Sequence, residues 1–202
     1  NKITETINAF SDEDLKKLVG TIFTENKEKL LKWPAAYKLH HAIRGGLLMH
    51  TLSIVKLCEG VCEVYPFVDK DLLLSGAILH DIAKTLEFNV GETGLANGYS
   101  VEGNLIGHLV MGAMMVREAA DKLGTDKKRE MLLEHMILSH HGEPEFGAAV
   151  RPLFLEAELL SELDLMDARV YQIHEAITPL KEDDFSGRLW ACLLYTSPSP
   201  RD

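Results

Sequence analysis

One stretch of the sequence, Leu72 to Lys84 (LLLSGAILHDIAK), constrains the fold more than any other. Its apolar run predicts a buried helix, yet the run ends in His80 and Asp81, with Lys84 one helical turn further on. Burying an imidazole and a carboxylate costs several kcal/mol unless a partner binds them, and a metal ion is the usual partner. We therefore expect other parts of the chain to supply further metal ligands.

Length and composition favour one compact helical domain. The chain has 202 residues, of which 46% are apolar, and this is enough for a single substantial core. Leu, Ala, Glu, Met and Lys recur at helical spacing, while alternating runs of β-branched residues are almost absent. The sequence predicts an all-α fold.

The formal net charge of −10 argues against an exposed basic surface that binds nucleic acid through its phosphates. It does not exclude a phosphate substrate. Two bound divalent cations can make a site locally positive in a chain that is acidic overall.

Cysteine use and hydropathy favour a cytoplasmic protein without membrane contact. Cys58, Cys62 and Cys192 form no Cys-x-x-Cys pair, and no apolar run reaches the roughly 18 residues that span a bilayer. The chain begins at Asn1 without a methionine or a signal peptide, so a longer parent protein is expected. Residues 191–202 are expected to be a disordered or non-native tail.

Helix start and stop signals divide the chain into predicted helices. Ser11 to Asp14 resembles a capping box, Asp69 is a candidate N-cap, and Gly142 is a candidate C-terminal breaker. The Gly- and Asn-rich segment 89–103 predicts a loop with a short hairpin at Asn97-Gly98. The predicted helices cover residues 11–31, 46–64, 69–84 and 104–123, a fifth begins at about Asp126 and ends within Ser139 to Gly142, and a last one opens at Arg151-Pro152.

Helical spacing places several metal-capable side chains on the apolar faces of these helices. His50 lies in line with Leu47 and Ile54, and Asp164 lies in line with Leu160. The polar residues expected to point inward are His50, His80, Asp81, His108, His140, His141 and Asp164. Two metal ions would satisfy such a set, and imidazole and carboxylate ligands suit Mn, Fe, Co, Ni or Zn.

The order of these residues resembles the HD-domain metal-dependent phosphohydrolase superfamily. Short sequence segments extend the similarity to the HD domain of YhaM-type 3′–5′ exoribonucleases. These segments are HHAIRGGLLMHT, ILHDIAK, ILSHHGEPEFG and ELLSELDLMDAR. The resemblance covers residues 1–190, including the helix at 11–31, and implies a bundle of about six to eight helices.

The resemblance also implies a division of the ligands between two ions, with Mn or Fe as the expected metals. One ion would be held by His50, His80, Asp81 and Asp164, and the other by Asp81, His108, His140 and His141. Asp81 would bridge the ions, and Lys84 would contact a phosphate oxygen or orient the attacking water. Asp167 is the alternative to Asp164 as the late aspartate ligand.

The implied activity is release of 5′-mononucleotides from the 3′ end of single-stranded RNA. An OB-type RNA-binding domain is expected upstream of Asn1, and a homo-oligomer is compatible with the sequence. Arg44 and His41 are candidate substrate contacts, although a solvated surface arginine and a structural loop histidine explain them equally well. Hydrolysis of small or cyclic nucleotides, and a non-catalytic metal-binding regulatory or interaction domain, are the alternative functions.

Overall fold

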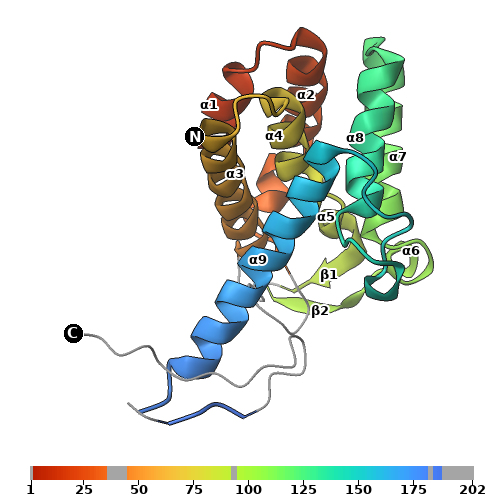
Figure 1. Cartoon of the computed structure of the whole chain (residues 1–202). Coiled ribbons are helices and arrows are strands. Elements are labelled where there is room, and N and C mark those ends of the chain that lie inside the picture. Colours follow the sequence, from red (N-terminus) through yellow and green to blue (C-terminus); the bar gives the residue numbers. More distant parts are fainter. Residues whose placement is uncertain (1, 36–44, 92–94, 182–183, 188–202) are drawn as a thin grey trace.

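The computed structural model describes residues 2–35, 45–91, 95–181 and 184–187. These residues form a helical bundle with one small two-stranded sheet (Figure 1), which confirms the predicted all-α fold with a short hairpin. In chain order the elements are α1 (Lys2–Asn8), α2 (Glu13–Leu30), α3 (Gly46–Val64), α4 (Lys70–Leu79), α5 (Lys84–Glu87), β1 (Phe88–Val90), β2 (Ala96–Tyr99), α6 (Val101–Leu105), α7 (His108–Leu123), α8 (Lys127–Ser139), the 3-10 helix η1 (Pro144–Phe146) and α9 (Leu155–Ile177).

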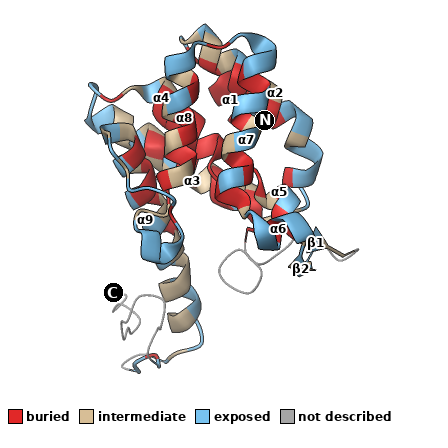
Figure 2. Ribbon diagram, turned by 90° about the vertical axis from the view of Figure 1, so that its right-hand side faces the viewer, coloured by how far each residue is buried: buried red, intermediate tan, exposed pale blue. Residues whose placement is uncertain are grey.

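Helix α4 is the centre of the bundle. Every residue from Leu72 to Leu79 is buried, and the helix contacts α2, α3, α8 and α9. Figure 2 shows the buried residues gathered in the interior of the bundle and the exposed residues around its outside. An all-round apolar helix needs neighbours on every side, so the run in the sequence correctly predicted the core helix.

Aspartates cap three of the long helices. Asp69 Oδ1 accepts from the backbone of Leu72, as predicted, and Asp126 caps α8 in the same way. At α2 the cap is Asp12 rather than Ser11, because Asp12 Oδ1 accepts from the backbone nitrogens of Asp14 and Leu15. A separate helix, α1, precedes it and was not predicted.

The predicted single helix that carries both His80 and Lys84 is wrong. Helix α4 ends at Leu79, and His80 is its C-cap. A turn of the 3-10 type follows and leads into the short α5. In it, the backbone nitrogens of Ile82 and Lys84 donate to carbonyls three residues earlier. This turn points Asp81 into the bundle from the end of α4.

The predicted continuous helix over residues 104–123 is also wrong. Gly107 adopts a φ of 76°, which separates α6 from α7. His108 is therefore the first residue of α7, where the backbone N–H groups lack partners within the helix. The break leaves both the ring and the backbone nitrogen of His108 available to a neighbouring acceptor.

The hairpin is present, but its turn lies elsewhere than predicted. Strands β1 and β2 pair in antiparallel fashion, with Phe88 opposite Tyr99 and Asn89 opposite Gly98. Asn97 and Gly98 thus belong to β2 rather than to the turn. Their turn preference is overridden by the pairing with β1.

Helix α9 begins at Leu155, four residues after the predicted Arg151, and Leu153 lies exposed before its start. Ala157 and Leu160 are buried against the bundle. The C-terminal half of α9 projects beyond the other helices (Figure 1).

Among the described residues, no helix is both long enough and apolar enough to cross a membrane. The predicted tail, 191–202, lies outside the described residues.

Candidate metal centre

The seven predicted metal residues lie together where α3, α4, α7, α8 and α9 converge. They form two groups, and within each group the candidate ligand atoms all lie within 4.8 Å of one another. The first group is His50, His80 and Asp164, and the second is Asp81, His108, His140 and His141.

The first group is held together by direct contacts. His50 Nε2 lies 3.1 Å from His80 Nε2 and 3.0 Å from Asp164 Oδ1. His50 and His80 are buried, and Asp164 remains partly accessible. Three nitrogen and oxygen ligand atoms therefore face a common point at the end of α4.

Asp81 lies between the two groups and presents one oxygen to each. Its Oδ2 atom is 3.7 Å from His50 Nε2 and 3.5 Å from His80 Nε2. Its Oδ1 atom is 3.3 Å from His108 Nε2 and 3.6 Å from His140 Nε2. A carboxylate placed in this way could bridge two cations.

The second group contains buried atoms that a cation would satisfy. Among the described residues, four buried side-chain atoms have no hydrogen-bond partner: Asp81 Oδ1, His108 Nε2, His140 Nε2 and Ser139 Oγ. Three of the four face one another in this group. Unsatisfied buried polar atoms cost about 1–3 kcal/mol each, so their concentration at one point fits a metal ion.

All five histidines of the centre are oriented in the same way. Each ring has Nδ1 at 2.8–3.0 Å from an oxygen acceptor, so each can present Nε2 as a ligand. The acceptors are the carboxylates of Asp167 for His50 and Glu87 for His108, and the carbonyls of Ala77 for His80, Ile137 for His140 and Phe146 for His141.

The two aspartates of α9 have different places in this arrangement. Asp164 Oδ1 faces the Nε2 atoms of the first group, whereas Asp167 Oδ2 lies 2.8 Å from His50 Nδ1, behind the ring. The geometry therefore puts Asp164 in the position of a ligand and Asp167 in the position of a residue that orients His50.

Glu87 is the site residue that sequence reasoning missed. It is buried, and its Oε1 atom lies 3.0 Å from His108 Nδ1 and 3.2 Å from the backbone nitrogen of His108. The only signal in the sequence was its position three residues after Lys84, which would place both on one face of a continuing helix.

Burial and neighbouring charges set the protonation of the centre. Burial lowers the pKa of His140 to about 3, and it also lowers the pKa of His80, so both imidazoles are neutral near pH 7 as metal ligands require. For His50, burial opposes the charged form, but hydrogen bonds to Asp164 and Asp167 outweigh it and raise the pKa to about 9.

Lys84 forms an ion pair with Asp81. Its Nζ atom lies 2.7 Å from Asp81 Oδ2. Although burial lowers the pKa of Lys84, the charge of Asp81 outweighs this effect and raises it. Lys84 is therefore a cation at the centre. The candidate substrate contacts His41 and Arg44 lie outside the described residues.

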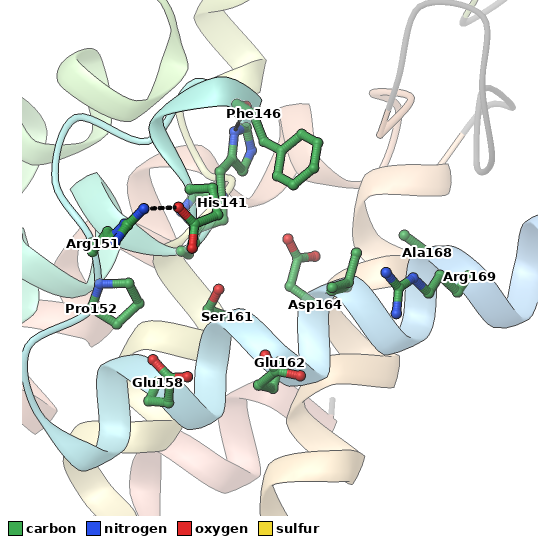
Figure 3. Close-up of a pocket in the computed structure, with 14 residues that line it drawn as sticks. His141, Phe146, Arg151, Pro152, Glu158, Ser161, Glu162, Asp164, Ala168 and Arg169 are labelled. Atoms are coloured by element: carbon green, nitrogen blue, oxygen red, sulfur yellow. Dashed lines mark hydrogen bonds and ion pairs between the residues drawn. The ribbon is translucent and has the colours of Figure 1, made fainter. Parts of the chain in front are cut away.

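A cavity of about 510 Å³ opens beside the centre. Asp164 and Ser161 line it from α9, and His141 and Phe146 line its other wall (Figure 3). Arg151 is paired there with Glu143 at 2.6 Å. A volume of this size suits a small organic ligand, and three of the candidate metal ligands, His140, His141 and Asp164, line it.

Comparison with known proteins agrees with the geometry. The family model for the HD domain matches residues 47–169, which is more than half of the chain and includes all seven candidate ligands. A search of solved structures found no match. HD domains are metal-dependent phosphohydrolases, and groups of histidine and aspartate that could hold a metal are present here. The chain belongs to the HD-domain family.

Proposed function

We propose that the chain is a phosphodiesterase that holds two divalent transition metal ions, with Mn or Fe as the expected metals. His50, His80 and Asp164 would hold one ion, His108, His140 and His141 would hold the other, and Asp81 would contact both. The observation that carries the proposal is the orientation of the Asp81 carboxylate. Its Oδ2 atom faces the first group and its Oδ1 atom faces the second.

Two bound dications would supply positive charge for the phosphoryl oxygens and lower the pKa of a shared water. The chain's own residues then have distinct tasks. Asp81 and the histidines fix the position of that charge, and Lys84, which reaches Asp81 at 2.7 Å, adds a fixed cation that can stabilise the charge developing on phosphate.

We further propose that the substrate is single-stranded RNA, shortened from its 3′ end with release of 5′-mononucleotides. The support is that the sequence segments around the candidate ligands, such as ILSHHGEPEFG, are similar to those of YhaM-type exoribonucleases. In this proposal an OB-type domain of the parent protein would hold the RNA, and His41 and Arg44 would contact the substrate.

One observation favours a second candidate, the hydrolysis of small or cyclic nucleotides. Glu158 and Glu162 line the cavity beside the centre together with the cation Arg169. Arg151 and Glu143 also line it, and they form an ion pair and neutralise each other. A wall of this charge repels a long polyanion more than it repels one nucleotide.

A hydrolysis assay distinguishes these functions. Protein reconstituted with Mn²⁺ is incubated with 5′-labelled single-stranded RNA and, separately, with cyclic and free nucleotides. Stepwise shortening of the RNA that is lost in His80→Ala and Asp81→Ala supports the exoribonuclease. Hydrolysis of nucleotides alone supports the second candidate, and bound metal without any hydrolysis contradicts both.

A further inference from the structure

The side chain of Phe146 is exposed, yet its backbone is fixed to the metal centre. The residue is 68% exposed at the end of η1. Its carbonyl oxygen accepts from His141 Nδ1 at 3.0 Å, and its nitrogen donates to Glu143 O at 2.9 Å. A single exposed apolar side chain is common on protein surfaces, so the surroundings of the ring decide whether it has a role.

Phe146 also lines the cavity beside the centre. In Figure 3 its ring lies next to His141, across the cavity from Asp164 and Ala168 of α9. Leu165 and Ala168 contribute apolar surface to the α9 wall, and Arg169 adds a cation. The lining of the cavity therefore combines candidate metal ligands, the aromatic ring of Phe146, and both apolar and charged side chains of α9.

Exposure alone does not distinguish Phe146, because Phe67 and Phe185 are exposed to 76% and 71%. Phe67 packs its ring against Tyr65 at 5.8 Å between centroids, in the connection between α3 and α4. Only Phe146, among these three, lines the cavity that Asp164 and His141 also line. Its position relative to the candidate ligands is what requires an explanation.

We propose that Phe146 stacks on the base of the nucleotide whose phosphate lies at the metal centre. The site would then select nucleotidyl substrates over simple phosphate esters, because every base has an aromatic face and a phosphate ester without a base does not. This inference rests on the proposed function, since it assumes that phosphate binds at the two groups of ligands.

The test compares two ligands that differ only in the base. Adenosine 5′-monophosphate and ribose 5-phosphate are titrated into the Mn²⁺-loaded protein by isothermal titration calorimetry. We expect the mononucleotide to bind about tenfold tighter. Phe146→Ala should abolish this difference without changing the affinity for ribose 5-phosphate, and Phe146→Trp should retain it.

Two controls make the result specific. Phe67→Ala removes an equally exposed phenylalanine away from the cavity and should leave both affinities unchanged. Metal content measured on each variant should equal that of the unaltered protein, because the hydrogen bond from His141 is accepted by the backbone carbonyl of Phe146 and not by its side chain.

Equal affinities for the two ligands in the unaltered protein, no binding of either, or an equal loss of both in Phe146→Ala would overturn the inference. Its failure is distinguishable from failure of the proposed function. Hydrolysis of RNA or nucleotides without a preference for the base removes only the stacking, whereas a base preference without any hydrolysis removes the phosphodiesterase and leaves the binding site.

Discussion

The two groups of ligands at the end of α4 differ in how they are satisfied. In the first group His50 contacts His80, Asp164 and Asp167 directly, at 2.8 to 3.1 Å. In the second group Asp81 Oδ1, His108 Nε2 and His140 Nε2 have no hydrogen-bond partner among the described residues, although all three are buried. The buried atoms of the centre that lack a hydrogen bond therefore all belong to the second group, apart from the neighbouring Ser139 Oγ.

This difference indicates which group depends more on metal. Buried polar atoms without partners destabilise the folded chain, so an ion that satisfies them contributes its binding free energy to folding. We expect the second group to be the more sensitive to metal removal. Substitutions in and around each group test this contrast.

The largest effect should come from Asp81, which serves both groups. Asp81→Ala removes both oxygens, and we expect hydrolysis to fall below about 1% of the unaltered rate, because even residues behind the ligands cost about 10–100-fold. Metal content should fall for both ions. A variant that retains full metal content would contradict the bridging position of Asp81.

Replacing a histidine in one group should remove one ion selectively. In His140→Ala the second group loses a ligand while the first group keeps all of its contacts, so about one metal ion per chain should remain. The matched variant His80→Ala should lose the other ion. Metal analysis of both variants checks this, and identical content of both ions in His140→Ala would refute the assignment of two separate groups.

The orienting carboxylates should have smaller and parallel effects. Glu87→Gln weakens the support of His108, and Asp167→Asn weakens the support of His50. Each should lower metal affinity by about 10–100-fold, in the second and the first group respectively. Titration of Mn²⁺ followed by calorimetry measures this. Unchanged affinity in both variants would mean that these contacts do not position the ligands.

The smallest effect concerns Gly103, which packs against the backbone of Glu87. A Cβ atom there would clash with the carbonyl oxygen of Glu87, so Gly103→Ala should destabilise the chain by about 1–3 kcal/mol. Because Glu87 orients His108, the substitution should also lower the metal affinity of the second group.

Gly60 in α3 is the control. Among the described residues, a Cβ atom at Gly60 would meet no other atom within 4 Å. Gly60→Ala should therefore stabilise the chain by about 0.5–1 kcal/mol. Denaturant unfolding of both variants, metal-free, tests the contrast.

The sequence predicted the candidate metal ligands better than it predicted the residues that orient them. Its helical periodicity correctly placed His50 on a buried face and identified α4 as the core helix, since both follow from local spacing. The position of Asp81 was predicted for the wrong reason, because the helix ends at Leu79 and a turn aims the side chain.

Helical periodicity could not predict the residues whose positions are set by tertiary contacts. Glu87 is buried where α5 meets α6 and α7, and neither its burial nor its contact with His108 is encoded in the spacing around it. The break at Gly107 was missed because an isolated glycine is tolerated within helices. The choice between Asp164 and Asp167 needed the orientation of His50, which only the fold supplies.

The number of metal ions that the chain binds through Asp81 is the most direct test of a dinuclear centre. Protein reconstituted with Mn²⁺ and freed of excess metal is analysed by mass spectrometry of its metals, beside Asp81→Ala treated identically. We expect two ions per chain in the unaltered protein and loss of both in the variant. No bound ion in the unaltered protein, or two ions in the variant, would contradict a carboxylate shared between two metals.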